Sequence, residues 1–156
     1  IRRSCSQAMF ELGPRKLNED VVVPFEHQLD LLEFLEALHQ ETGLPTPTFG
    51  HAADGNFHAH IMYDDADPDR RKEAENAVRR LMDTVIDLRG AISGEHGIGL
   101  AKSPFFSLQH SPSEITAMKA VKQALDPLNI LNPDKIWSPC EPWTFTREDV
   151  RMPWDH

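Results

Sequence analysis

The chain has 156 residues, 40% of them hydrophobic and 26% charged, a composition typical of a globular domain with a buried core. Its formal net charge is −9 with histidine neutral, and it has no basic stripe, which argues against a nucleic-acid partner. No apolar run approaches the roughly 18 residues that span a bilayer, and no signal peptide is visible. Cys5 and Cys140 lie far apart, so we expect free thiols in a reducing, cytoplasmic compartment.

The first half of the chain predicts three strands and one helix. Residues 2–17 are mixed in character and indicate at most a short helix. The β-branched run over 20–25 predicts a strand. A helix is predicted over 27–42, where Leu31, Leu35 and Leu38 recur at helical spacing before Gly43 ends it. Two further strands, 48–51 and 57–63, flank a tight turn at Asp54-Gly55-Asn56.

The second half adds two helices and a short strand. A helix over 70–89 presents one apolar face, and a strand over 91–93 leads into a glycine-rich loop. A last helix over 113–125 has Ser113 as its predicted N-cap and an apolar stripe of its own. We predict that both apolar faces are core: Ala74, Ala77, Val78, Leu81, Met82 and Val85 in the first, and Ile115, Met118, Val121 and Leu125 in the second.

The order of the first six elements predicts the fold. Strand, helix, strand, strand, helix and strand form the ferredoxin-like pattern, an α+β fold with an antiparallel sheet and both helices on one face. The final helix is an addition to it. Residues 138–156 form a tail rich in proline and tryptophan. We interpret this tail as a strap over its own core, in preference to a docking segment for another domain or subunit.

Two histidine-bearing motifs stand out in the sequence. The first is Gly50-His51-Ala52-Ala53-Asp54-Gly55-Asn56-Phe57-His58-Ala59-His60, and the second is Ser93-Gly94-Glu95-His96-Gly97-Ile98-Gly99. A hairpin at the first motif would bring His51 and His58 together across two strands. Two imidazoles and a carboxylate suit a divalent metal with open positions. The spacing alone does not decide between such a site and solvated surface histidines.

These motifs resemble the two signatures of the C-terminal domain of FAD-linked oxidases, the group of the glycolate oxidase FAD subunit, D-lactate dehydrogenase and D-2-hydroxyglutarate dehydrogenase. A third match is the segment Leu125-Asp126-Pro127-Leu128-Asn129-Ile130-Leu131-Asn132-Pro133-Asp134-Lys135, and a weaker fourth is Glu19-Asp20-Val21-Val22-Val23-Pro24. The resemblance runs over 2–137. Ala53 and Asp134 stand where the family usually has glycine.

The resemblance implies a set of site residues. His51, His58 and Glu95 would bind a divalent metal (Zn, Mn or Fe), and His96 would accept the substrate hydroxyl proton, unless it serves only as a hydrogen-bonding residue of its loop. His60 would be an extra metal ligand or a hydrogen-bond donor to the substrate, and we favour substrate contact. Arg2 and Arg3 would bind the substrate carboxylate, with an ordinary surface role as the alternative. Gly94, Gly97, Asn132 and Lys135 would lie against the flavin, or else belong to simple turns.

The resemblance also implies an activity. We expect residues 1–137 to be the substrate and metal domain of an enzyme that oxidises a small D-2-hydroxy acid, of glycolate or D-lactate type, with hydride transfer to FAD. No sequence here resembles a flavin domain, so we expect that domain to be supplied in cis or in trans. An electron-acceptor subunit could attach the protein peripherally to the inner membrane. The alternatives are a binding protein that has lost the chemistry and a metal-dependent hydrolase.

Overall fold

The structure is a computed structural model that describes residues 5–137. The chain divides into two compact units, residues 1–96 and residues 97–156. The predicted division at residue 137 lies at the edge of the described residues and stays a prediction, as does the role of the tail. Arg2, Arg3, Cys140 and the side chain of Cys5 lie outside the described part.

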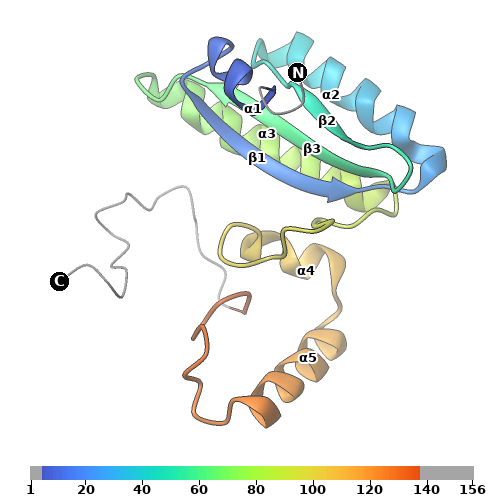
Figure 1. Ribbon diagram of the computed structural model, residues 1–156, viewed down its shortest axis with the longest axis vertical. Helices are drawn as coiled ribbons and strands as arrows, with labels where there is room; N and C mark the ends of the chain where they lie inside the picture. The colour runs from blue at the N-terminus through green and yellow to red at the C-terminus, as the bar shows by residue number, and fades with distance from the viewer. Residues whose placement is uncertain (1–4, 138–156) are drawn as a thin grey trace. The chain divides into compact units, whose positions relative to one another are not determined.

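The first unit is built on an antiparallel sheet of three strands in the order β1-β3-β2. The strands are β1 (Arg15–Val22), β2 (Thr48–His51) and β3 (Asn56–Tyr63). The long helices α2 (Gln28–Thr42) and α3 (Pro68–Asp87) both cover one face of this sheet, as Figure 1 shows. The predicted α+β class, with an antiparallel sheet and helices on one face, is therefore confirmed.

Short elements connect these parts. Helix α1 (Cys5–Ala8) and the 3₁₀ turn η2 (Met9–Glu11) precede β1, and η3 (Phe25–His27) leads from β1 into α2. The first strand begins at Arg15, not at residue 20, because all of Arg15–Val22 is paired with β3. Leu17 is the one apolar residue of its first six, so this half of the strand lacks the alternation that predicts one.

The predicted fourth strand is reduced to a single bridge. Ala91 and Val22 exchange two backbone hydrogen bonds, of 2.8 and 3.0 Å, so residue 91 sits beyond β1 where a ferredoxin-like fourth strand belongs. The strand does not continue, because the next backbone N–H groups are directed elsewhere: those of Gly94, Glu95 and His96 donate to the side chain of Asp20.

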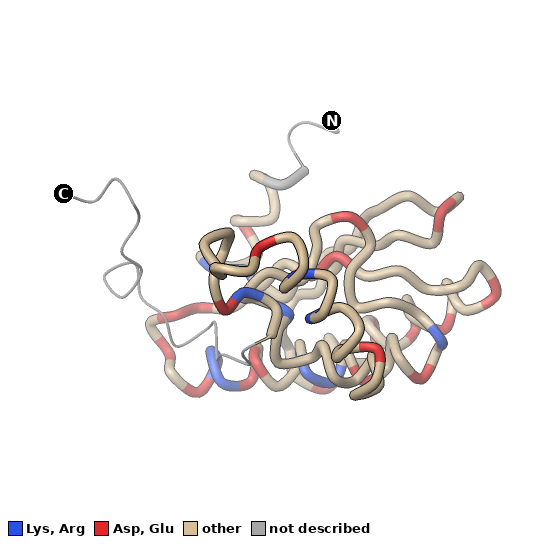
Figure 2. Tube along the Cα trace, turned by 90° about the horizontal axis from the view of Figure 1, so that it is seen from below, with Lys and Arg blue, Asp and Glu red and all other residues tan. Residues whose placement is uncertain are grey.

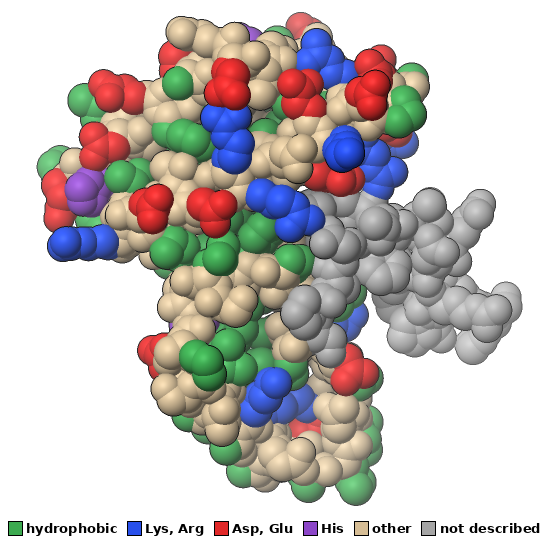
Figure 3. All heavy atoms as spheres, turned by 180° about the vertical axis from the view of Figure 1, so that it is seen from behind, with side chains coloured by type: hydrophobic (Ala, Val, Ile, Leu, Met, Phe, Trp, Pro, Cys, Tyr) green, Lys and Arg blue, Asp and Glu red, His purple; other side chains and the backbone are tan. Residues whose placement is uncertain are grey.

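The core of the first unit lies between the sheet and the two helices. The three predicted leucines of α2 are buried, and so are all six predicted residues of α3. The side of this unit seen in Figure 3 carries interspersed acidic and basic side chains. One bidentate ion pair, Arg80 with Glu41 at 2.8 and 3.0 Å, links α3 to α2 across the surface.

Truncation of Leu81 should be the costliest change in this core. The side chain is fully buried, and Leu81→Ala is expected to lower the free energy of unfolding by about 2–5 kcal/mol because a cavity remains. Urea unfolding monitored by circular dichroism measures this loss. Asn76→Ala, at an exposed position of the same helix, is the control and should stay within about 0.5 kcal/mol of the parent.

The second unit contains η4 (Ser103–Phe105), α4 (Phe106–Gln109) and α5 (Pro112–Leu125). The N-cap of α5 is Ser111, so the prediction of Ser113 was wrong. Ser111 and Glu114 form a reciprocal capping box, in which the Glu114 carboxylate accepts from the Ser111 backbone N–H at 2.8 Å. The reason is spacing: the box needs Ser and Glu three positions apart, and Pro112 suits the first helical turn.

The apolar stripe of α5 is not core, which corrects the prediction. No described side chain of α5 is buried, and Val121 and Leu125 are 60% and 79% exposed. Helical periodicity identifies an apolar face correctly here. It carries no information on whether a covering surface lies in the same chain.

The turn that follows α5 is organised by Asp126. Its carboxylate accepts hydrogen bonds from the backbone N–H groups of Ile130 (3.0 Å) and Leu131 (2.9 Å) and pairs with Lys122. The bond from Lys122, followed by those from the backbone, lowers the pKa of Asp126.

Because the folded pKa is the lower one, Asp126 should stabilise the folded chain above its unfolded pKa of about 3.9. That contribution is lost as the pH falls through the folded pKa. Asp126→Asn should therefore lower the melting temperature at pH 7 and weaken its dependence on pH on the acid side. Thermal unfolding followed by circular dichroism from pH 7 to pH 2 measures both effects, with Asp134→Asn as the control. An unchanged melting temperature at pH 7 would contradict the expectation.

Two surface properties agree with the composition. In the described residues, lysine and arginine are scattered among more numerous acidic residues along the chain, as Figure 2 shows. None of the helices within residues 5–137 combines the length and the hydropathy that crossing a bilayer requires.

Candidate metal and substrate site

Strand β3 directs its histidines to the face of the sheet opposite α2 and α3. Side chains alternate along a strand, so Phe57, Ala59 and Ile61 face the helices while His58 and His60 face the other way. The strand register places Asp20 of β1 directly opposite His58 on that same face. This face is called the site face below.

The β2–β3 hairpin brings His51 to the same place. The His51 and His58 rings lie 5.8 Å apart, edge to face. Two glycines make the hairpin possible: a Cβ at Gly50 would lie 2.1 Å from the Asn56 carbonyl oxygen, and Gly55 has φ +69° in the turn. Ala53 does not have a positive φ, so alanine in place of the family's glycine strains nothing.

The loop after the Ala91 bridge is held on the site face by one carboxylate. Oδ2 of Asp20 accepts the backbone N–H groups of Gly94 (2.9 Å), Glu95 (2.8 Å) and His96 (2.9 Å). The Ser93 hydroxyl donates to the same oxygen at 3.3 Å. Asp20 itself is fully buried.

This loop sets Glu95 and His96 beside His58. Oε1 of Glu95 lies 3.5 Å from Nε2 of His58 and 3.8 Å from Nε2 of His96. The His96 ring stacks on that of His58, with centroids 5.2 Å apart and planes inclined by 19°. Residues 37 positions apart in the chain, His58 and Glu95, are thereby in contact.

Two sets of side chains in the described residues could each hold a metal ion, and both include His58. In the first set, His51, His58 and Glu95 each offer a ligand atom, and in the second Asp20, His58 and His96 do; within each set these atoms lie within 4.8 Å of one another. Bonds of about 2.0–2.2 Å to a shared ion need ligand atoms roughly 3–4 Å apart, so small side-chain rotations would close either set. Because Oδ2 of Asp20 already accepts four hydrogen bonds, Asp20 would have to bind an ion of the second set through Oδ1.

His60 belongs to neither set. It is 2% exposed and stacks on Phe49, with ring centroids 5.1 Å apart. Its Nδ1 lies 3.1 Å from the Pro47 carbonyl oxygen, which can only accept, so Nδ1 carries the proton. Burial, and then the charge of Lys16, lowers the pKa of His60. The neutral ring therefore presents Nε2 as an acceptor, so contact with a substrate hydroxyl would have His60 accepting the hydrogen bond. The substrate contact of His60 stays a prediction, in which this geometry favours an acceptor over the expected donor.

A hollow of about 220 Å³ opens on the site face. His58, His60, Glu95 and His96 line it on one side, and Lys16, Asn18 and Phe49 complete it. Imidazole, carboxylate and ammonium groups thus converge on a space sized for a small molecule. The sequence motifs assign no role in this site to Asp20, Lys16, Asn18 or Phe49. The signal available for Asp20 was its position at the start of the β-branched run in the fourth family-like segment.

The predicted flavin-contacting glycines and polar residues fall in two places. Gly94 lies at the histidine cluster, where a Cβ would come within 2.8 Å of the Asn56 side-chain amide. Gly97, Asn132 and Lys135 belong to the second unit. There Asn132 and Lys135 line a separate hollow of about 520 Å³ with Gly99, Leu100 and Ile136, and the Ile136 N–H donates to the Gly99 carbonyl oxygen at 3.0 Å. Arg2 and Arg3 lie outside the described residues.

Asn132 and Asp134 in this segment have φ of +47° and +60°. Left-handed φ favours glycine, and Asn and Asp are the next best tolerated. This explains how Asp134 can stand where the family has glycine.

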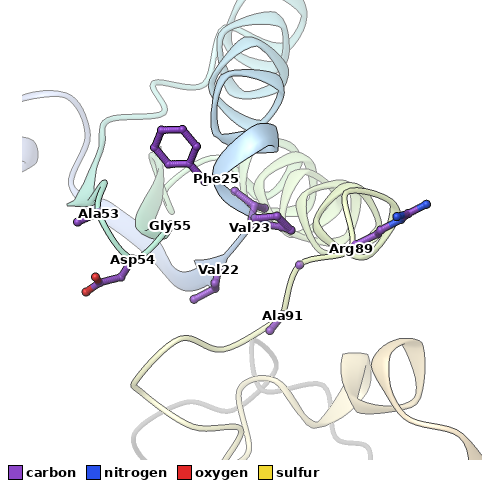
Figure 4. Close-up of a pocket in the computed structure, with 10 residues that line it drawn as sticks. Val22, Val23, Phe25, Ala53, Asp54, Gly55, Arg89 and Ala91 are labelled. Atoms are coloured by element: carbon purple, nitrogen blue, oxygen red, sulfur yellow. The ribbon is translucent and has the colours of Figure 1, made fainter.

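Another hollow, of about 330 Å³, lies at the end of β1 beside the hairpin turn. Figure 4 shows its mainly apolar lining, with Val22, Val23, Phe25 and Ala91. Its two charged residues, Asp54 and Arg89, point away from each other in Figure 4. It therefore lacks converging chemical groups of the kind found at the histidine cluster.

Comparisons with known proteins agree with the motifs. Residues 1–136 match the family described as FAD linked oxidases, C-terminal domain. The chain is 36% identical to glycolate oxidase subunit GlcD of Bacillus subtilis (strain 168) over 137 residues, which is 88% of this chain and 29% of that protein. It is 39% identical over 118 residues to the mitochondrial D-lactate dehydrogenase [cytochrome] of Kluyveromyces lactis, covering 76% of this chain and 20% of that protein.

A third relative is glycolate oxidase subunit GlcD of Escherichia coli (strain K12), 34% identical over 134 residues, or 86% of this chain and 27% of that protein. The chain thus spans less than a third of the length of these three relatives. The match of the family description to nearly all the described residues agrees with the two histidine motifs and with the fold. The chain belongs to the family of the C-terminal domain of FAD linked oxidases.

Proposed function

We propose that this chain is the substrate and metal domain of a flavin-dependent enzyme that oxidises a small D-2-hydroxy acid, of glycolate or D-lactate type, to the 2-oxo acid. The observation that carries the proposal is the convergence of His58, Glu95 and His96 on one hollow in a chain of this family, with a ligand atom of His51 within 4.8 Å of those of His58 and Glu95. The hollow of about 220 Å³ has room for a small hydroxy acid.

The ligand set in this proposal is His51, His58 and Glu95. Two imidazoles and one carboxylate suit Zn, Mn or Fe and leave coordination positions for a substrate. When bound, such an ion stabilises the negative charge that develops on the substrate hydroxyl oxygen.

His96 is the proposed acceptor of the hydroxyl proton. Its ring is half exposed and lines the hollow next to His58, so a bound hydroxy acid can reach it. Oxidation removes that proton together with a hydride from the α-carbon, and a flavin held by a partner domain would supply the hydride acceptor. The substrate leaves as the 2-oxo acid, and the proton resides on the His96 imidazole until solvent takes it.

The remaining residues hold and orient the acid in this proposal. His60 accepts a hydrogen bond through Nε2, and the ammonium group of Lys16 raises the local positive potential for a carboxylate. Arg2 and Arg3 stay predicted carboxylate ligands. Gly94, Gly97, Asn132 and Lys135 stay predicted flavin contacts, supported for the last two by the hollow they line together.

The flavin domain, an electron-acceptor subunit and a cytoplasmic location with peripheral membrane attachment also remain proposals. A binding protein without chemistry is the weaker alternative, because Ala53, its main support in the motifs, adopts an ordinary backbone conformation.

Metal content tests the proposed function directly. We expect elemental analysis to find about one Zn, Mn or Fe per purified chain, and none in the His51→Ala/His58→Ala double variant. His27→Ala serves as the control, because His27 pairs with Asp30 at 2.8 Å and belongs to neither ligand set. A parent protein that neither contains metal nor binds Zn²⁺ or Mn²⁺ on titration would contradict the proposal.

A further inference from the structure

Asp20 is a fully buried carboxylate in the middle of the site face. Burying a charge is costly unless hydrogen bonds replace the lost water. Here Oδ2 alone receives three consecutive backbone N–H groups and one hydroxyl. Convergence of successive N–H groups on one anion is a nest, a geometry that binds negative charge strongly. These four hydrogen bonds therefore stabilise the buried charge of Asp20 and at the same time fix the backbone of the loop.

The conformation of the loop does not come from regular secondary structure. Residues 93–96 belong to no helix or strand, and the Glu95 and His96 side chains are 54% and 48% exposed. Gly94 packs so closely on Asn56 that a Cβ would come within 2.8 Å of its side-chain amide. These contacts hold the loop against the ends of β1 and β3. Asp20 accepts hydrogen bonds from the backbone N–H groups of Glu95 and His96, the two loop residues of the proposed site.

The other oxygen of Asp20 faces His58. Oδ1 lies 3.8 Å from Nδ1 of His58, while Oε1 of Glu95 lies 3.5 Å from Nε2 of the same ring. A negative charge on the Nδ1 side favours the tautomer with its proton there. Nε2 then keeps its lone pair on the side of Glu95 and His51. At 3.8 Å this influence is electrostatic, longer than the hydrogen bond through which carboxylates commonly orient histidine ligands.

We infer that Asp20 is the positioning residue of the histidine site: it fixes the 93–96 loop so that Glu95 and His96 stand beside His58, and it directs Nε2 of His58 toward the ligand space. Asp20 does not bind the ion itself. The expected consequence, a lower metal affinity when Asp20 is changed, rests on the proposed metal site. The structural part of the inference, the fixing of the loop, is measurable whether or not metal binds.

Hydrogen exchange on the parent protein tests the structural part without any substitution. We expect the amides of Gly94, Glu95 and His96 to exchange at least tenfold more slowly than those of unstructured residues, although they lie outside helices and strands. Free exchange at these three amides would overturn the inference.

Asp20→Asn tests the link to metal. This change keeps the shape and one acceptor oxygen but removes the charge. We expect a loss of exchange protection at residues 94–96. We also expect the affinity for Zn²⁺ or Mn²⁺, measured by chelator competition, to fall about 10–100-fold, the range typical of residues that orient metal ligands. The ¹⁵N shifts of His58 in the metal-free protein should move away from those of the Nδ1–H tautomer.

Two matched variants separate these effects from general ones. Asp54→Asn removes an equal charge in the hairpin turn, where the Asp54 N–H bonds the His51 carbonyl, and should leave affinity and loop protection unchanged. Ser93→Ala removes only the longest of the four contacts and should change both by less than threefold.

Three outcomes of the Asp20→Asn experiment would overturn the inference. Unchanged loop protection with unchanged affinity would show that Asp20 positions nothing. Lost metal binding with full protection at residues 94–96 would make Asp20 a ligand. Equal losses in Asp54→Asn would assign the effect to charge alone. If Asp20→Asn does not fold, hydrogen exchange in the parent and the metal affinity of Gly94→Ala decide the question. The added Cβ in Gly94→Ala pushes the loop away from Asn56. Lost metal affinity in this variant supports the inference, and unchanged affinity overturns it.

Discussion

His51→Ala should abolish tight metal binding while His96→Ala leaves it nearly intact. The two possible ligand sets share His58 but differ in these two histidines, so the pair of variants identifies the set in use. Loss of His51 should weaken Zn²⁺ or Mn²⁺ binding by more than about 100-fold, beyond the effect of an outer-shell group. Loss of His96 should change it by less than about threefold.

The measurement is a chelator competition titration on each purified variant, with circular dichroism as the test of folding. His51 is a clean choice because its ring contacts His58 only edge-on, at 5.8 Å. The reverse result, tight binding without His51 and none without His96, would transfer the site to Asp20, His58 and His96. It would also remove His96 from its proposed role in proton transfer.

His96→Gln should impair turnover far more than it impairs binding. In the complete flavin-loaded enzyme, we expect kcat for the 2-hydroxy acid to fall about 10²–10⁴-fold, the usual contribution of a positioned general base. Glutamine retains hydrogen-bonding capacity and similar length but cannot accept the hydroxyl proton. The KM should change little, because the proposed carboxylate contacts do not involve His96.

Stopped-flow reduction of the flavin under anaerobic conditions measures the affected step directly. Asn76→Gln, at the exposed position on α3, is the matched control and should leave both constants unchanged. A fall of less than tenfold in the reduction rate, with metal still bound, would show that His96 only stacks on His58 and that another group or water takes the proton. His60, whose Nε2 is an acceptor, would be the next residue to change.

Much of the first unit follows from local rules that the sequence obeys. Helix α2 appears where Leu31, Leu35 and Leu38 repeat at helical spacing, and it ends at Gly43, which has φ +69°. The hairpin forms at Asp54-Gly55, where the turn needs a residue that tolerates positive φ. These features depend on neighbours within a few positions, which is why periodicity and turn chemistry suffice to predict them.

The misplaced features depend on distant partners. The fourth strand reduces to the Ala91 bridge because Asp20, more than 70 positions away, takes the following N–H groups. The stripe on α5 has the right period but stays exposed, since periodicity does not identify a covering surface. The early part of β1 is a strand because β3 pairs with it throughout.

Local pattern in the chain therefore suffices for the family, for the order of the first five predicted elements, and for identifying the histidines and the glutamate that could bind a metal or a proton. Which of them meet depends on the three-dimensional fold: it brings His58, Glu95 and His96 to one hollow, sets His51 beside His58 and Glu95, and assigns Gly97, Asn132 and Lys135 to the other unit. It also revealed Asp20, whose neighbours in the chain give no hint of its four donors. The physical reason is that a charged carboxylate can be buried only where hydrogen-bond donors replace its hydrating water, and the donors to Asp20 come from a distant part of the chain.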